Sequence, residues 1–433
     1  DNIGFAEQIG IPTNRIYKDF DVFIEEELKL PEDERIQVVS ILTPNFLHFP
    51  MAKKLLESGF NVICEKPMTT TFEEAQILSK RGKEIIHFEA GQPTARLPNS
   101  AFKQALDKIK TTNVSYTSPL GLNLLKKKIS NYYLKKYRAN VNHNRIIITF
   151  GSSGAFILAF LSAFDKGDTI GVTVPNYPAY KNMIKAFDLK MKPIFCNSKK
   201  NFEYNFQNIC KYKNINGILI SNPLNPTGAV IKKEEIKKIS MFCKKNKIRI
   251  IADEIYHGID FSGDSNTFFN YNNQSIIINS FSKYFLLTGW RIGWLICPDN
   301  LYSSIKNLAP NLFVAPPTIS QYVAISALDY DNYLKKIVKT YEQNMHLLYK
   351  NLPKIGFQPV IKPEGSFYLY ADVSKISNNS VQLCKNLLKK YGLVLTPGTD
   401  FDSIEGNKYV RFCYSYPKKD IIKGIKKLNS IFL

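Results

Sequence analysis

Between residues 145 and 297, short runs of β-branched and apolar residues alternate with polar segments. Such runs are typical of strands that are buried on both faces. Amphipathic helical patterns, such as residues 232–245, lie between them. Strands that alternate with helices favour an α/β fold with a mostly parallel sheet between two layers of helices. The predicted strands are residues 145–150, 168–174, 217–221, 249–252 and 275–279.

Each of these predicted strands runs directly into a polar or turn-forming segment. The segments begin at Gly151, Pro175, Asn222, Asp253 and Ser280. Open α/β sheets bind ligands outside the carboxyl ends of their strands. We therefore expect these five segments to meet at one edge of the sheet and to form the functional site.

The segment that begins at Ser280 reads Ser-Phe-Ser-Lys-Tyr-Phe-Leu-Leu-Thr-Gly-Trp-Arg and contains the strongest candidate for covalent chemistry, Lys283. A lysine that forms a Schiff base must spend part of its cycle neutral, which burial and nearby cations favour. The hydroxyls of Ser280 and Ser282 and the guanidinium of Arg291 are groups that a phosphate-bearing cofactor requires. Most lysines are solvated surface charges, so the assignment depends on the whole set of segments.

Together these segments resemble the class I/II aminotransferases of the fold-type I pyridoxal phosphate (PLP) enzymes, from about residue 77 to the end. The resemblance implies a seven-stranded large domain over residues 116–298 and a smaller α/β domain formed by residues 77–115 and 299–433. It also implies that Lys283 forms the Schiff base with PLP and that Ser280 and Arg291 hold its phosphate. The backbone N–H groups of a helix that begins at Gly151 would suit the same phosphate.

The resemblance assigns further roles around the cofactor and the substrate. Tyr177 would stack on the pyridine ring, Asn225 and Tyr256 would bond its phenolic oxygen, and Asp253 would keep the ring nitrogen protonated. The residues implied for the cofactor are Gly151, Ser152, Ser153, Tyr177, Asn225, Asp253, Tyr256, Ser280, Lys283 and Arg291, with Tyr116 supplied across a homodimer interface. The residues implied for the substrate are Gly91, Asn225 and Arg411, of which Arg411 would grip the α-carboxylate with a bidentate fork.

Residues 1–76 resemble a different family, the nucleotide-binding domain of the Gfo/Idh/MocA oxidoreductases. The pattern predicts a strand over 38–42, a helix from about 51 to 58 and a strand over 61–64, followed by Glu65-Lys66-Pro67. It matches only the later half of that domain, and no G-x-G-x-x-G turn is present for a pyrophosphate. We expect this truncated Rossmann-like fragment to bind no dinucleotide and Lys66 to have no catalytic role. A helix over 71–83 would join the two parts; a natural fusion, a relic and a gene-model error remain open.

Composition is compatible with a soluble enzyme. The formal charge of +21 comes mainly from lysines that are spread along helix faces, without a nucleic-acid-binding module. No apolar run reaches the roughly 18 residues of a membrane helix, and no signal peptide opens at Asp1. The seven cysteines are scattered singly and suggest neither a metal site nor disulfides. We expect a cytoplasmic protein that binds neither a membrane nor a specific nucleic acid.

The function that these observations favour is the transfer of an amino group between an amino acid and a 2-oxo acid through Lys283. A β-lyase or a decarboxylase would use the same site, because PLP stabilises whichever carbanion the protein orients. A PLP-sensing regulator and an NAD-dependent oxidoreductase are weaker alternatives, since a DNA-binding helix-turn-helix and the Gly-rich turn are both missing.

Overall fold

The computed structural model describes residues 6, 11–65, 67–71, 73–75, 85–112, 114–196, 202, 204–263 and 266–433. The chain forms two compact units, Asp1–Ile85 and Ile86–Leu433. The division follows Ile85, whereas the sequence suggested a boundary at residue 76. Each unit has its own hydrophobic core and is described separately.

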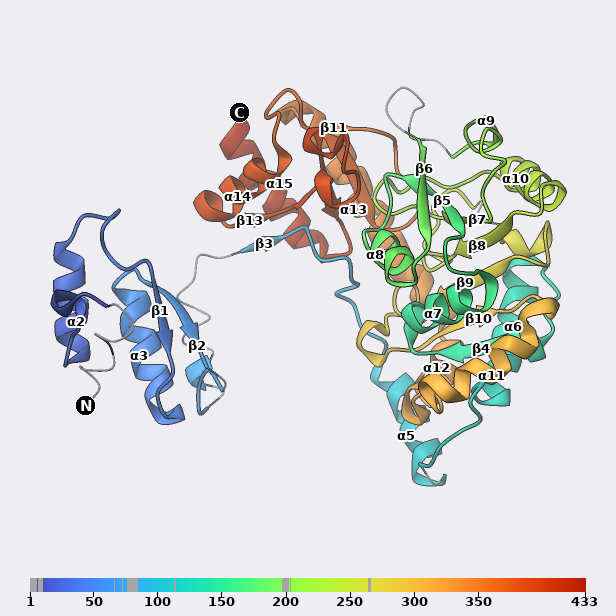
Figure 1. The fold of residues 1–433 in the computed structure, drawn as a ribbon, viewed down its shortest axis with the longest axis horizontal. Helices are drawn as coiled ribbons and strands as arrows, with labels where there is room; N and C mark the ends of the chain where they lie inside the picture. The colour runs from blue at the N-terminus through green and yellow to red at the C-terminus, as the bar shows by residue number, and fades with distance from the viewer. Residues whose placement is uncertain are drawn as a thin grey trace. The chain divides into compact units, whose positions relative to one another are not determined.

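The first unit is a small α/β fragment, drawn in blue in Figure 1. Its elements are η1 (Thr13–Arg15), α2 (Phe20–Lys29), β1 (Val38–Ile41), α3 (Asn45–Glu57) and β2 (Asn61–Cys64). The strands β1 and β2 pair in parallel, in register from Val38 with Asn61 to Ile41 with Cys64. Ile24, Leu55 and Phe60 form the centre of the core between the helices and this ribbon.

The helix predicted to begin near residue 51 begins earlier, at Asn45. The prediction placed the start after Pro50, because proline lacks the N–H that an inner turn requires. Here the helix continues through Pro50, and the preceding turn is anchored by the buried His48, whose ring nitrogens lie 2.6 Å from the Thr43 carbonyl and 2.7 Å from the Pro67 carbonyl.

Two predictions for the join between the units fall largely outside the described residues. Lys66 lies outside them, as does most of the helix predicted over 71–83. The described start of that helix has a capping box, in which Glu74 N donates to Thr71 Oγ1 (3.2 Å) and Thr71 N donates to Glu74 Oε2 (3.1 Å).

The second unit contains the predicted mostly parallel sheet of seven strands, which the structure confirms. The strand order is β4-β10-β9-β8-β7-β5-β6, and only β10 runs antiparallel to its neighbours. The strands are β4 (Ile146–Thr149), β5 (Thr169–Val174), β6 (Lys190–Phe195), β7 (Gly217–Ser221), β8 (Arg249–Asp253), β9 (Ile276–Ser280) and β10 (Gly293–Ile296). Five of them correspond to the predicted strands, and β6 and β10 were not predicted.

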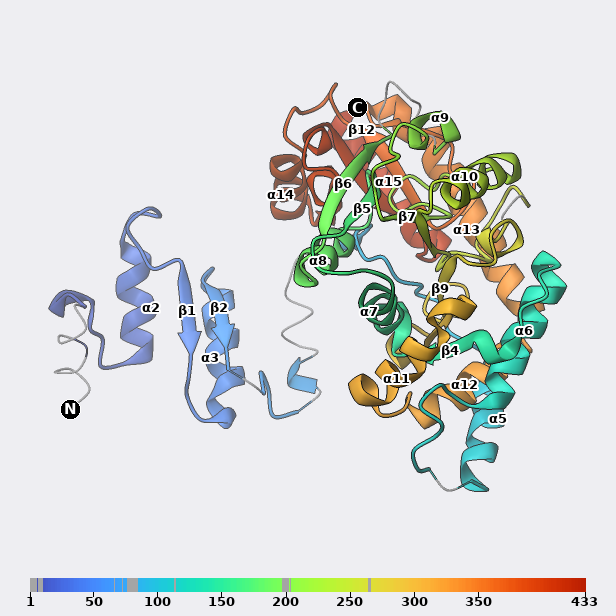
Figure 2. The same cartoon turned by 45° about the vertical axis from the view of Figure 1, so that its right-hand side comes forward.

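Helices cover both faces of this sheet (Figures 1 and 2). Ile147 and Leu219 pack on one side against α7 (Gly151–Ala163), α8 (Ala179–Ala186) and α11 (Tyr302–Phe313). Neighbours such as Ile148 and Ile218 point to the other side, toward α6 (Asn123–Tyr137) and α10 (Lys233–Lys245). Because successive strand residues face opposite sides, an all-apolar strand is what a two-sided core requires.

A smaller, antiparallel sheet has the order β11-β12-β15-β14. Its strands are β11 (Gln358–Pro359), β12 (Tyr368–Asp372), β14 (Thr396–Pro397) and β15 (Tyr409–Cys413), and the helices α13 (Asp331–Asn351), α14 (Ser380–Tyr391) and α15 (Lys418–Phe432) belong to the same part. Beside it, β3 (Ile86–His87) pairs in parallel with β13 (Leu393–Val394).

Three helices that the sequence assigned to the smaller domain lie with the large sheet. Leu301, Ile305 and Ala309 on or next to α11 belong to the core below that sheet. Ser326, on α12 (Thr318–Ala327), donates a hydrogen bond to the carbonyl of Ala101 (2.8 Å), which lies on α5 (Asn99–Lys110). No helix among the described residues is long and apolar enough to cross a membrane.

Candidate active site

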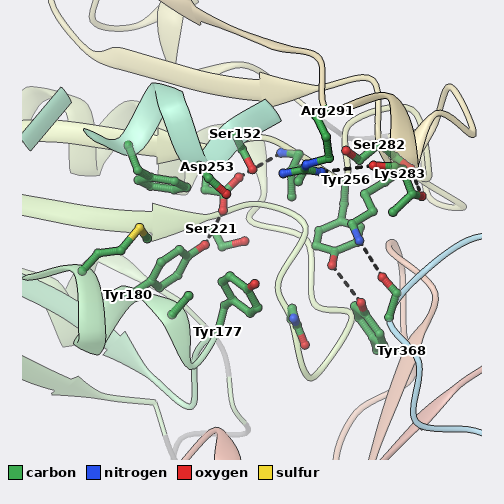
Figure 3. Close-up of a pocket in the computed structure, with 18 of the residues that line it drawn as sticks. Ser152, Tyr177, Tyr180, Ser221, Asp253, Tyr256, Ser282, Lys283, Arg291 and Tyr368 are labelled. Atoms are coloured by element: carbon green, nitrogen blue, oxygen red, sulfur yellow. Dashed lines mark hydrogen bonds between the residues drawn. The ribbon is translucent and has the colours of Figure 1, made fainter. Parts of the chain in front are cut away.

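A cavity of about 320 Å³ lies at the carboxyl ends of the large sheet's parallel strands, where it is also lined by the smaller sheet (Figure 3). It brings together residues from the segments that the sequence singled out. Its lining comprises Gly91, Ser152, Ser153, Phe156, Tyr177, Ala179, Tyr180, Met183, Ser221, Asn225, Asp253, Ile255, Tyr256, Ser282, Lys283, Thr288, Arg291, Tyr368 and Arg411.

Lys283 projects into this cavity from the turn that follows β9. Its Nζ donates a hydrogen bond to the Gly91 carbonyl at 2.5 Å. Burial lowers the pKa of Lys283 to about 8, and the positive charges of Arg411 and Arg291 act in the same direction. A lysine with such a pKa can supply a neutral amine near neutral pH, as a nucleophile or a general base requires.

Asp253 is the last residue of β8 and is buried, as expected for a carboxylate that acts on a cofactor ring. It accepts hydrogen bonds from the Tyr180 hydroxyl and from Ile255 N (3.1 Å). Burial raises the pKa of Asp253 to about 6, although both hydrogen bonds and the charge of Lys283 oppose the rise. The protein thus holds a carboxylate in an environment that favours a cationic partner.

One end of the cavity is suited to a phosphate. The helix α7 begins there at Gly151 and continues through Ser152 and Ser153, so unpaired N–H groups of its first turn are available to an anion. Gly151 has a positive φ of 63°, and a Cβ at this position would lie 2.8 Å from Arg291 Nη2. The glycine therefore allows the guanidinium of Arg291 to lie against the start of the helix.

The two serines before Lys283 differ in position. Ser282 lines the cavity, whereas Ser280 does not belong to its lining. The Ser280 hydroxyl is buried, where it donates to the Ile292 carbonyl (3.0 Å) and lies 2.9 Å from Ser282 Oγ. In this structure Ser280 therefore supports Ser282 from behind, and Ser282 presents the exposed hydroxyl.

Arg411 projects from β15 into the opposite part of the cavity. Its Nη1 donates to Asn225 Oδ1 (3.0 Å), and its Nη2 donates to the Glu89 carbonyl (2.7 Å). The guanidinium also lies 4.2 Å from the ring centre of Tyr368. Its Nε is buried and has no hydrogen-bond partner. A charged group with an unused donor in a cavity is what a carboxylate ligand would complete.

Aromatic side chains form the remaining walls. The hydroxyls of Tyr256 and Tyr368 lie 2.9 Å apart, and the ring of Tyr177 meets that of Tyr180 edge to face, with 5.5 Å between their centres. At Gly91 a Cβ would collide with the Tyr368 hydroxyl, so glycine is required there. The predicted residue Tyr116 does not belong to the lining and is 84% exposed.

Four polar residues of the lining were not predicted: Tyr180, Ser221, Thr288 and Tyr368. Tyr180 follows Tyr177 by three positions, which places both side chains on the same side of α8, and this spacing was a usable signal. Tyr368 begins a strand in the smaller sheet, and nothing in its local sequence indicates that it meets the Lys283 segment. Ser221 ends β7, directly before the predicted turn segment.

The burial of Asp253 predicts a stability change that depends on pH. Because the folded state raises its pKa from 3.8 to about 6, the folded protein binds more protons than the unfolded chain between these values, and stability falls as pH rises through this range. Asp253→Asn should therefore gain roughly 1–3 kcal/mol on the wild type between pH 4 and pH 7. Urea unfolding of both proteins, free of added ligands, at several pH values measures this difference. The exposed Asp188→Asn is the matched control; a difference for Asp253→Asn that is constant across pH would contradict the prediction.

Comparisons with known proteins agree with this geometry. Residues 83–428 match the family model described as aminotransferase class I and II, and residues 4–84 match the oxidoreductase family with an NAD-binding Rossmann fold. A valine–pyruvate aminotransferase of Mycobacterium tuberculosis is 33% identical over 80% of this chain and 91% of its own length. An aspartate aminotransferase of Sulfolobus acidocaldarius is 29% identical over 82% and 91%. The crystal structure of an aminotransferase from Mycobacterium tuberculosis superposes with a TM-score of 0.79 at 32% identity, covering 83% of this chain and 95% of the other.

Proposed function

Since the chain belongs to the class I and II aminotransferase family, we propose that the cavity around Lys283 binds PLP, the cofactor of that family, and that Lys283 is the reacting amine. The protein is an aminotransferase, which moves an amino group between an amino acid and a 2-oxo acid. The observation that carries the site assignment is the convergence of Asp253, Lys283, Arg291 and Arg411 in one cavity of about 320 Å³.

The residues of the cavity fit PLP in charge and in space. The start of α7 and Arg291 would hold the phosphate, and the missing side chain of Gly151 leaves room for this contact. Asp253 would face the ring nitrogen, since a buried carboxylate favours a protonated partner. Tyr177 would lie against the ring, and Asn225 and Tyr256 would bond the phenolic oxygen.

The protein's own groups divide the chemistry. PLP supplies an aldehyde that takes up the amino group and a ring that accepts electrons from Cα. Arg411 and Asn225 bind and orient the α-carboxylate, so that the Cα proton lies within reach of Lys283. Lys283 Nζ, with its pKa near 8, takes this proton as a general base and returns it as a general acid.

Single-turnover spectroscopy tests the proposed function. Protein loaded with PLP is mixed with a panel of amino acids, the cofactor's visible absorption is followed, and the 2-oxo acid is quantified. Loss of the absorption with one equivalent of 2-oxo acid, and its return when a 2-oxo acid is added, is expected for transamination. Release of ammonia or carbon dioxide in place of a reversible exchange would instead indicate a β-lyase or a decarboxylase.

We also propose that the enzyme is a cytoplasmic homodimer in which Tyr116 completes the partner's phosphate site. Tyr116 is 84% exposed and lies in the segment that precedes α6, outside the cavity of its own chain. An aromatic side chain so exposed is a candidate for burial in an interface. The seven cysteines are free, which is compatible with a reducing compartment.

Mixed dimers test the role of Tyr116. Lys283→Ala and Tyr116→Ala should each be strongly impaired alone, for lack of the reacting amine and of a phosphate contact. When the two proteins are unfolded together and refolded, random pairing gives about a quarter of sites with both native residues, because a hybrid dimer has one such site if Tyr116 acts across the interface. Recovery of transamination is the expected result. If refolded mixtures stay at the level of Tyr116→Ala alone, Tyr116 acts within its own chain or has no role.

A second test concerns the first unit, which we propose supplies no catalytic group and binds no dinucleotide. A chain that begins at residue 83 retains the whole aminotransferase match and the β3–β13 pair. It should keep PLP binding and kcat within about twofold, because additive behaviour is expected of separate units. Calorimetry with NADH and NADPH on the full chain should show no micromolar binding. A short chain that is folded and loaded with PLP but inactive would contradict this.

A further inference from the structure

We propose that the site selects amino acids with uncharged side chains, chiefly apolar and aromatic ones, and discriminates against aspartate and glutamate. This inference rests on the proposed function and adds the substrate class. Among the relatives, one is named for valine and another for aspartate, so family membership leaves the class open. The distribution of charge around Arg411 decides between them.

The described lining of the cavity contains three cations, and each already has a role. Arg291 lies at the start of α7, where the cofactor phosphate would be held, and Lys283 is the reacting amine. Arg411 is left for the α-carboxylate. A second substrate carboxylate would therefore find no cation among these lining residues.

The side chains around Arg411 offer apolar surface. The ring centre of Tyr368 lies 4.2 Å from its guanidinium carbon, and that of Phe401 lies 4.7 Å from it. Phe401 is 5% exposed, and its position is fixed from the large sheet's side, because Asn176 N donates to the Phe401 carbonyl (3.1 Å). This hydrogen bond joins the loop of Tyr177 to the loop after β14, so both aromatic walls are held in place together.

The next charged group near Arg411 is a carboxylate, Asp400. Surrounding protein raises the pKa of Asp400, and the charge of Arg411 partly opposes this rise, which places the two groups within electrostatic range of each other. A substrate with a second carboxylate would bring another negative charge into this region. It would lose water without gaining a cationic partner, whereas a methyl or phenyl group would gain apolar contact.

The test compares amino donors in the half-reaction of the PLP-loaded full chain, which needs no acceptor. The second-order rate constant of the absorbance change is measured for L-alanine, L-valine, L-leucine, L-phenylalanine, L-aspartate and L-glutamate. The best neutral donor should exceed both acidic donors by about 100-fold or more, because a desolvated, unpaired group is strongly selected against. An acidic donor that equals the best neutral donor would overturn the inference. Absence of a change with every donor would instead count against the proposed function.

Asp400→Asn tests the electrostatic cause. Removal of this charge should raise the rate constants for aspartate and glutamate by about two- to fivefold, as expected for a like charge screened by solvent, and leave valine and leucine unchanged. Asp188→Asn, which removes an exposed carboxylate between α8 and β6, is the matched control and should change no ratio. An equal effect of Asp400→Asn on neutral and acidic donors would overturn the assignment of this role to Asp400.

Discussion

Lys283→Ala should abolish transamination, with a loss of about 10⁴-fold or more in kcat, and should leave the fold intact. The variant lacks both the amine that engages the cofactor and the group that moves the Cα proton, and each role alone is worth orders of magnitude. PLP should still bind through Arg291, Asp253 and the start of α7, but without the visible absorption that depends on the lysine. Turnover assays and absorption spectra of the purified variant measure both effects.

A matched control separates this effect from a general loss of charge. Lys237 lies on the exposed side of α10, and Lys237→Ala should retain full activity and the full spectrum. Normal turnover of Lys283→Ala would contradict the assignment. Far-ultraviolet circular dichroism checks that the variant is folded.

Arg411→Ala should lower kcat/KM for amino acids by roughly 30- to 1,000-fold, or about 2–4 kcal/mol, the usual effect of removing a charge-assisted partner. The cofactor spectrum should not change, because Arg411 contacts Asn225 and the Glu89 carbonyl and lies apart from the start of α7. Steady-state kinetics with one good donor measure the loss.

The substitution Arg411→Lys distinguishes a fork from a simple charge. Lysine retains the charge but cannot bond both carboxylate oxygens in a planar arrangement, so recovery should be partial. Amines that lack the carboxylate, such as 1-aminoalkanes, should react equally slowly with the wild type and with Arg411→Ala. If such amines were as good as amino acids for the wild type, Arg411 would have another role.

The strands of the large sheet could be predicted where burial on both faces produced an uninterrupted apolar run. Ile146–Thr149 and Ile276–Ser280 are of this kind, and every residue in them is buried. The edge strand β6 alternates between exposed and buried positions and contains Pro193, which is tolerated because β6 pairs only with β5. A central strand could not contain that proline, and the sequence alone does not say which strand lies at the edge.

The site was predictable where its residues follow a strand directly. Asp253, Asn225 and Lys283 lie at or just after carboxyl ends, and the sheet brings such positions together regardless of the distance between them in sequence. Tyr368 comes from a separate sheet, so its contact with Tyr256 depends on how the two parts pack. The orientation of a side chain is also invisible in sequence, as the different positions of Ser280 and Ser282 show.

The claim that Lys283 carries the cofactor can be tested directly by chemical trapping. The PLP-loaded full chain is reduced with sodium borohydride, digested, and mapped by mass spectrometry, which locates the stable pyridoxyl group on a single peptide. The account predicts the label on Lys283 and its absence after pre-incubation with a reactive amino donor. A label on another lysine, or no label in a protein that retains bound PLP, would contradict it.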